Sequence, residues 1–287
     1  MVETYSGQAK HIEVDGNRVC YIDEGSGRPL LFVHGLGGTM NNWAPNIAFF
    51  RERYRVVALD LPGYGESDYA DVDYSLEFFT RVILGLLERL GLEKVTVIGH
   101  SLGGLITLHL ALNHPDVVEE IVLVDAAGGH RFPRALQWGV RGLPEKWVKF
   151  VILLTASYLL RFPYGYRVAG VYHVNRYTKA LLDYQAALPE RPDLDNYLEA
   201  YYRTTRTAVS ATYADRLGEI DVPALLVWGQ KDGSVPHRVG RHVNRMIRGS
   251  YLVSVARAAH VPQLDRPEVF NAAVLRFLLG SEGVAGA

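Results

Sequence analysis

The chain has 287 residues, 48% of them hydrophobic, so it can bury a large core as one domain with an insertion or as two domains. Its 30 Lys and Arg residues nearly balance 31 Asp and Glu residues, which gives a formal net charge of -1. This balance gives no overall electrostatic reason to expect nucleic acid or an anionic membrane as a partner, so a small-molecule ligand is favoured.

The single cysteine, Cys20, excludes an internal disulfide and any cysteine-based zinc or iron–sulfur cluster. It lies in an apolar run and is predicted to be a small buried core residue. The first residues, MVETYSGQAKHIEVDG, contain no apolar stretch of the secretory type, so a cytoplasmic protein is expected.

Short apolar, β-branched runs alternate with helical patterns, which predicts an α/β fold with a mostly parallel sheet and helices on both faces. In chain order, the predicted strands are 18–23, 29–34, 54–60, 94–99, 121–125, 224–229 and 250–256. Apolar residues at helical spacing predict helices over 76–90, 102–113 and 267–279, followed by a loose tail over 280–287.

The alternation stops between residues 126 and 213, where the pattern is helical and interrupted by prolines. We interpret this cap segment as a helical insertion after the strand that ends at Asp125, with residues 1–125 and 214–287 forming the core domain. Ten of the 17 tyrosines lie in residues 158–213, and residues 130–206 hold twelve basic against six acidic residues. Either these charges form a solvated face while the tyrosines pack the cap onto the core, or the cap favours acidic or aromatic substrates.

One stretch of the cap segment, residues 150–160, is nearly all apolar. At about ten residues it is half as long as a bilayer-spanning helix, so no integral membrane segment is expected. We favour a lid helix that lines an acyl pocket. Buried cap core and contact with a lipid surface are the alternatives.

The segment Gly99-His100-Ser101-Leu102-Gly103 matches the G-x-S-x-G pattern, in which a serine sits on a sharp turn between a strand and a helix. Glycine flanks such a turn because backbone segments approach too closely there for side chains. A buried-strand pattern precedes the motif and a helical pattern follows it, so the context supports the match. Ser101 is the predicted nucleophile.

A serine hydroxyl needs a base within hydrogen-bond reach, and the chain has ten histidines. His260 is favoured because it follows the last predicted strand, at the carboxyl edge of the sheet where such sites form. The acid that orients it is predicted to be Asp232, which follows the preceding strand and keeps the chain order Ser, Asp, His. Asp125 ends a strand at the same edge and remains a competing acid.

The oxyanion that forms when the serine attacks a carbonyl needs hydrogen-bond donors. The backbone N–H groups of Leu102 and of Leu36, which lies in the glycine-rich segment 34–38, are the candidates. Gly35 and His100 adjoin these donors and are predicted to contact substrate. Alternatively, the glycines serve only a tight loop.

Segments 34–38, 60–67, 99–103, 228–232 and 260–262 together resemble the capped α/β-hydrolase family over about residues 10–280. Two small departures are Ala259 and Asp265, where the family often has Gly and Glu. The resemblance implies an α/β-hydrolase fold with an eight-stranded sheet, a cap after the sixth strand, and no cofactor or metal.

Branches of this family differ in chemistry more than in fold. Haloalkane dehalogenases and epoxide hydrolases have aspartate at the elbow, so Ser101 argues against both. Carbon–carbon hydrolases of aromatic degradation often have Asn before the serine and a Gly-Pro-Gly loop, whereas His100 and Gly-Leu-Gly-Gly resemble carboxylesterases and small lipases. The sequence therefore predicts a carboxylesterase that cleaves small or medium acyl esters through an acyl-serine intermediate. Carbon–carbon bond or lactone hydrolysis is the alternative, and a non-catalytic ligand-binding receptor of the same fold is a distant one.

Overall fold

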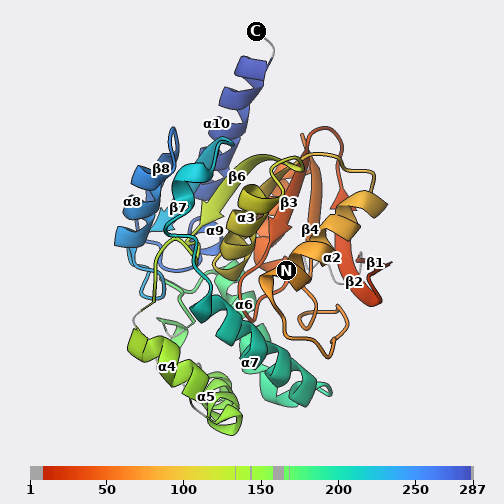
Figure 1. The fold of residues 1–287 in the computed structure, drawn as a ribbon, viewed down its shortest axis with the longest axis vertical. Helices are drawn as coiled ribbons and strands as arrows, with labels where there is room; N and C mark the ends of the chain where they lie inside the picture. The colour runs from red at the N-terminus through yellow and green to blue at the C-terminus, as the bar shows by residue number, and fades with distance from the viewer. Residues whose placement is uncertain (1–8, 133, 143, 158–164, 168, 286–287) are drawn as a thin grey trace.

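The computed structural model describes residues 9–132, 134–142, 144–157, 165–167 and 169–285, and these form one eight-stranded sheet with helices around it (Figure 1). The strands are β1 (Lys10–Val14), β2 (Asn17–Glu24), β3 (Pro29–Val33), β4 (Arg55–Leu59), β5 (Val95–His100), β6 (Val118–Val124), β7 (Ala224–Gly229) and β8 (Tyr251–Val255). Their order in the sheet is β1-β2-β4-β3-β5-β6-β7-β8. The β1/β2 and β2/β4 pairs are antiparallel and the other pairs are parallel, which confirms the predicted mostly parallel sheet.

The central strands are continuous apolar runs because side chains on both of their faces are buried. Along β3, Leu31 and Val33 belong to one apolar core, whereas Leu30 and Phe32 belong to the other. Helices α2 (Leu76–Arg89), α3 (Leu102–Asn113) and α8 (His237–Met246) contribute to the first core. Helices α1 (Ala44–Phe50) and α10 (Pro267–Ala285) contribute to the second, so the sheet is covered on both faces.

The predicted strands and helices agree with these elements, with ends shifted by a few residues, but helices α1 and α8 were not predicted, and the two ends of the chain also differ. Strand β1 was not predicted, because it is a short edge strand that contains two charged residues, Lys10 and Glu13, and mostly exposed or half-buried side chains. The predicted loose tail is wrong over 280–285, since α10 continues to Ala285. A glycine such as Gly280 lowers helix propensity by about 1 kcal/mol but does not end a helix. Residues 1–8 and 286–287 lie outside the described residues.

The cap segment contributes only helices among its described residues. They are α4 (Arg134–Gly142), α5 (Glu145–Ser157), α6 (Arg176–Ala186) and α7 (Leu194–Ser210), with 3₁₀ turns at Gly165–Arg167 and Leu188–Glu190. Figure 1 shows α7 below the sheet, with α4 and α5 farther from it. Tyr197 of α7 is buried and packs edge-on against Tyr64, with ring centroids 5.9 Å apart. This tyrosine therefore packs the cap segment onto the rest of the chain. That is the role that one of the two interpretations of the sequence gave to the cap tyrosines.

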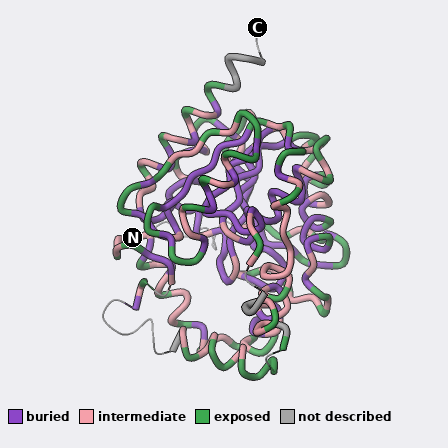
Figure 2. The backbone as a smooth tube through the Cα atoms, turned by 60° about the vertical axis from the view of Figure 1, so that its left-hand side comes forward, coloured by how far each residue is buried: buried purple, intermediate pink, exposed green. Residues whose placement is uncertain are grey.

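The apolar stretch 150–160 falls largely on α5, and residues 158–160 lie outside the described residues. Ile152 and Leu153 pack against the larger core, but Phe150, Val151 and Leu154 are 53%, 56% and 40% exposed. Figure 2 shows this end of the molecule as largely exposed, in contrast to the buried sheet. The interpretation as buried cap core is thus wrong for the outer face of the helix. Within the described residues, no helix is long and apolar enough to cross a membrane.

Candidate active site

Ser101 occupies the turn between β5 and α3, with φ of 52° and ψ of -109°. A positive φ is rare for a residue with a side chain, and such strain is characteristic of functional turns. The flanking glycines make the turn possible. A Cβ on Gly99 would overlap the backbone of Gly103, and a Cβ on Gly103 would overlap the carbonyl of Val33.

His260 lies between Ser101 and Asp232 and is hydrogen-bonded to both. Its Nε2 is 3.0 Å from Oγ of Ser101, and its Nδ1 is 2.8 Å from Oδ2 of Asp232. The Asp232 side chain is fully buried, and its Oδ1 also accepts hydrogen bonds from the backbone N–H groups of Ser234 and Val235. Burial is the largest single influence and favours the neutral acid, but the hydrogen bond and charge of His260, together with hydrogen bonds from Asp125 and from the N–H of Val235, outweigh it, so the pKa of Asp232 is lowered. The three residues predicted from sequence therefore lie in one hydrogen-bonded row.

Asp125, the competing acid, is fully buried behind Asp232. Its carboxyl accepts the backbone N–H of Gly229 at 3.1 Å. Burial, the charge of Asp232 and a hydrogen bond between the two carboxyls raise the pKa of Asp125 well above its ordinary value. Asp125 thus keeps its proton and donates a hydrogen bond to Asp232, because two carboxylates in contact do not both ionise. His260 Nδ1 is bonded to Asp232 and not to Asp125.

The segment 34–38, which carries the predicted donor Leu36, lies directly beside the nucleophile. A Cβ on Gly35 would be 3.2 Å from Cβ of Ser101. His34 fixes this segment: its Nδ1 donates to the carbonyl of Gly35 at 2.7 Å, and its Nε2 accepts the backbone N–H of Leu61 at 2.9 Å. Burial lowers the pKa of His34 to about 4, so the ring is neutral and can serve both roles. The other predicted donor, Leu102, begins α3, where backbone N–H groups have no partner within the helix.

His100 connects the serine turn to the loop that carries His260. Its Nε2 donates to the backbone carbonyl of His260 at 2.6 Å, and the two rings lie 4.9 Å apart between centroids. Burial and the nearby His260 lower the pKa of His100 to about 3, so it is a neutral donor through Nε2. Its Nδ1 faces the place that a Cβ on Gly35 would occupy, at 2.7 Å. The predicted contact of Gly35 and His100 with substrate stays a prediction.

Two residues that hold the His260 loop in place were not identified from the sequence as doing so. Asp265 accepts the backbone N–H groups of Ala259 at 2.8 Å and Tyr172 at 3.0 Å, and so ties the loop of His260 to the cap segment. Gly170, which has φ of 73°, accepts the backbone N–H of His260 at 2.8 Å. A Cβ on Gly170 would lie 2.6 Å from Cβ of His260. The carboxylate five positions after His260 was visible in the sequence, but its partners in the cap segment were not.

Two groups of possible metal ligands occur among the described residues. One comprises Asp125, Asp232 and His260, which are already hydrogen-bonded to one another. The other comprises His11 and Glu66, both exposed, and the buried Cys20. Burial, together with the charges of Asp60 and Glu66, raises the pKa of Cys20 to about 12, so its sulfur is a thiol. Neither group has a role as a metal site in the reaction proposed for Ser101.

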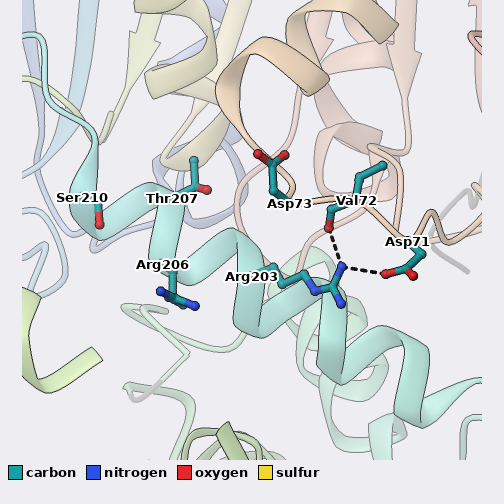
Figure 3. Close-up of a pocket in the computed structure, with 7 residues that line it drawn as sticks. All are labelled: Asp71, Val72, Asp73, Arg203, Arg206, Thr207 and Ser210. Atoms are coloured by element: carbon teal, nitrogen blue, oxygen red, sulfur yellow. Dashed lines mark hydrogen bonds and ion pairs between the residues drawn. The ribbon is translucent and has the colours of Figure 1, made fainter. Parts of the chain in front are cut away.

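A hollow of about 830 Å³ lies between α7 and the loop at residues 71–73 (Figure 3). Its lining is Asp71, Val72, Asp73, Arg203, Arg206, Thr207 and Ser210. Arg203 crosses it to reach Oδ1 of Asp71 at 2.8 Å and the carbonyl of Val72 at 2.6 Å. None of the residues around Ser101 lines this hollow, so it is an ion-paired junction between the cap segment and the rest of the chain.

Residues 28–267 match the model of the alpha/beta hydrolase fold family, and the chain belongs to that family. A 2-hydroxy-6-oxononadienedioate/2-hydroxy-6-oxononatrienedioate hydrolase from Burkholderia vietnamiensis is 31% identical over 290 aligned positions, covering 97% of this chain and 98% of that protein. A protein of the same name from Paraburkholderia phymatum is 30% identical with the same coverage.

Among solved structures, a probable hydrolytic enzyme from Pseudomonas aeruginosa superposes with a TM-score of 0.81 at 25% identity, covering 94% of this chain and 93% of that one. The family and these hydrolase relatives identify the chain as a hydrolase.

Proposed function

We propose that Ser101 is a nucleophile activated by His260, with Asp232 as the acid that holds the imidazole in place. The hydrogen-bonded row from Ser101 through His260 to Asp232 carries this proposal, because it joins three distant segments at one edge of the sheet. His260 takes the hydroxyl proton on Nε2 as Oγ attacks a carbonyl carbon. Asp232 stabilises the imidazolium that results, and the neutral Asp125 donates a hydrogen bond to Asp232, which stays ionised.

The N–H groups of Leu36 and Leu102 are proposed to stabilise the oxyanion. Two observations support them. The segment of Leu36 is held against Ser101 by His34, and Leu102 begins a helix whose N-terminus carries partial positive charge.

For the bond that is cleaved, we favour carbon–carbon hydrolysis of an unsaturated dicarboxylate, or hydrolysis of a related enol lactone. Two relatives that match this chain over nearly its whole length act, by their names, on 2-hydroxy-6-oxo dienedioates and trienedioates. The excess of basic residues in 130–206, twelve against six, suits a substrate of that charge. This proposal reverses the preference for a carboxylesterase drawn from the sequence.

The residues of this chain can perform the carbon–carbon cleavage with water as the only other reactant. The proton of the 2-hydroxyl group first moves to the carbon beside the oxo group, so that this carbon becomes saturated and the 2-hydroxyl becomes a 2-oxo group. Oγ of Ser101 then bonds to the oxo carbon, and the adjacent carbon–carbon bond breaks with its electron pair delocalised into the conjugated 2-oxo acid. The leaving carbon receives the proton that His260 took from the serine. Water, deprotonated by His260, then hydrolyses the acyl-serine ester and releases a carboxylic acid.

A carboxylic ester is the second candidate, and His100 favours it. In carbon–carbon hydrolases the corresponding position is often Asn, whereas Nε2 of His100 is already bonded to the carbonyl of His260. His100 therefore offers no free donor to a substrate carboxylate.

A substrate panel separates these candidates. The purified chain is compared on a 2-hydroxy-6-oxo dienedioate, an enol lactone, and nitrophenyl esters from acetate to decanoate, with the Ser101→Ala variant as the blank. The proposal expects the highest kcat/KM on the dienedioate or the lactone. A higher kcat/KM on the esters makes the second candidate the function. Turnover of none of them favours the receptor interpretation over any hydrolase activity.

A further inference from the structure

Helix α5 carries an apolar stripe that faces away from the rest of the molecule. Trp147, Phe150, Val151 and Leu154 recur at the spacing of one helix face and are between 40% and 56% exposed; we call them the α5 stripe. Trp138 of α4 is 74% exposed. Helices α4 and α5 both pack on α7 and form the end of the molecule opposite α10 (Figure 1).

The α5 stripe is not needed to attach the helix to the protein. Ile152 and Leu153, on the opposite face, pack against the larger core. On the same inner side, Nζ of Lys149 forms an ion pair of 2.6 Å with Glu199 of α7. A helix anchored in this way ordinarily has polar residues on its outer face, and single exposed apolar residues need no explanation. Four exposed apolar residues on one face require an explanation, and the helix that precedes α5 in the chain carries a further exposed tryptophan.

The surrounding sequence is strongly basic although the whole chain is nearly neutral. Residues 131–154 contain five basic residues, Arg131, Arg134, Arg141, Lys146 and Lys149, and one acidic residue, Glu145. Two of these charges are offset by acidic partners, since Arg131 pairs with Asp215 and Lys149 pairs with Glu145 and Glu199. The segment still keeps an excess of basic residues beside the α5 stripe, which the overall charge of -1 conceals. An apolar face with aromatic residues and flanking positive charge complements an anionic lipid surface.

We propose that the α5 stripe and Trp138 dock the protein peripherally on an anionic lipid bilayer. The aliphatic and phenyl side chains enter the boundary between headgroups and acyl chains, the two tryptophans lie at headgroup level, and the exposed Lys146 contacts lipid phosphates. A second copy of the chain is a poorer occupant, because a symmetric contact would bring the same basic segment against itself. This docking is independent of the proposed reaction, since it involves none of the residues around Ser101.

The tryptophans provide the readout. The chain has four, and two of them, Trp43 and Trp228, are fully buried. A change of emission on adding vesicles therefore reports on Trp138 and Trp147. With vesicles of equal parts phosphatidylcholine and phosphatidylglycerol, we expect a blue shift, quenching by brominated lipid, and co-sedimentation that weakens with salt. Phosphatidylcholine vesicles alone are expected to bind less protein.

Substitutions in the α5 stripe test whether it is the surface that binds the vesicles. The double change Trp147→Ser with Phe150→Ser should lower the partition coefficient by about tenfold or more, because two large apolar side chains no longer leave water. Tyr251→Ser is the matched control: Tyr251 is 67% exposed on β8, and its loss should leave partitioning unchanged. Lys146→Gln should weaken binding to the anionic vesicles only. Unchanged circular dichroism and melting temperature show that each variant is folded.

Three outcomes would overturn the proposal. They are absence of binding to anionic vesicles at low salt, equal binding by the double variant and the parent, and a loss of binding in Tyr251→Ser as large as in the double variant. Self-association that the double variant abolishes, without vesicle binding, would assign the surface to a second copy of the chain instead.

Discussion

Two neighbouring carboxyls, Asp125 and Asp232, should respond very differently to the same change from Asp to Asn. Asp232 is ionised and bonded to Nδ1 of His260, so Asp232→Asn removes the charge that stabilises the imidazolium. By analogy with other serine triads, we expect kcat to fall by about 10⁴, which corresponds to roughly 5 kcal/mol of transition-state stabilisation.

Asp125→Asn should have little effect on kcat, because an asparagine side chain can form the same hydrogen bonds as the protonated aspartic acid. The amide oxygen can accept the N–H of Gly229, and the amide nitrogen can donate to Asp232. Asn also tolerates the backbone at this position, where φ is 41°. We expect kcat to change by less than about tenfold, a difference below roughly 1.4 kcal/mol.

Asp125→Leu is the contrasting variant. It leaves the buried N–H of Gly229 without its partner and should lower the free energy of unfolding by about 1–3 kcal/mol. The assay is steady-state turnover of the best substrate from the panel, with urea unfolding of each variant. The reasoning is refuted if Asp125→Asn loses about 10⁴ in kcat while Asp232→Asn does not.

Two further predictions concern buried histidines and a cap glycine. Because His34 and His100 stay neutral in the fold, with pKa values lowered to about 4 and about 3, the unfolded chain binds more protons below its ordinary histidine pKa. These two rings should therefore make the free energy of unfolding fall as the pH drops below about 6.5, by up to about 2.7 kcal/mol per pH unit, while Asp60, whose pKa burial raises to about 6, acts in the opposite direction. Urea unfolding of the parent and of the double variant His34→Gln with His100→Gln measures the contribution of the rings as the difference between the two profiles, and equal slopes in both proteins would contradict the neutral rings. Gly170→Ala places a methyl group against His260 and should lower kcat, whereas Gly249→Ala, also at positive φ but with open space around it, should reduce only stability, by about 1 kcal/mol; equal kcat values in the two variants would argue against the contact.

The sequence was sufficient to predict the sheet, because buried parallel strands are continuous apolar runs that turn residues separate. It was insufficient for β1, whose charged side chains follow from its place at the edge of the sheet. It also could not foresee the outward face of α5. Periodicity shows that Phe150 and Ile152 lie on different faces, but only the packing on α7 decides which face is buried.

The row of Ser101, His260 and Asp232 was predictable because each residue follows the carboxyl end of a strand at one edge of a parallel sheet. The different roles of Asp125 and Asp232 could not be predicted from the sequence. The difference depends on which carboxyl is hydrogen-bonded to Nδ1 of His260 and on which one keeps a proton. The first follows from a contact between residues 28 apart in the chain, and the second from contacts of Asp125 with the segment that contains Gly229, 104 residues away. The support that Gly170 and Asp265 give to His260 was hidden for the same reason.

Covalent labelling tests most directly whether His260 activates Ser101. The protein is treated with a serine-directed phosphonate, digested, and the modified peptide identified by mass spectrometry, in parallel with the His260→Gln variant. We expect a single phosphonate on Ser101 in the parent and a labelling rate lower by orders of magnitude in the variant. Labelling of another serine, or equal rates in the two proteins, would contradict the mechanism.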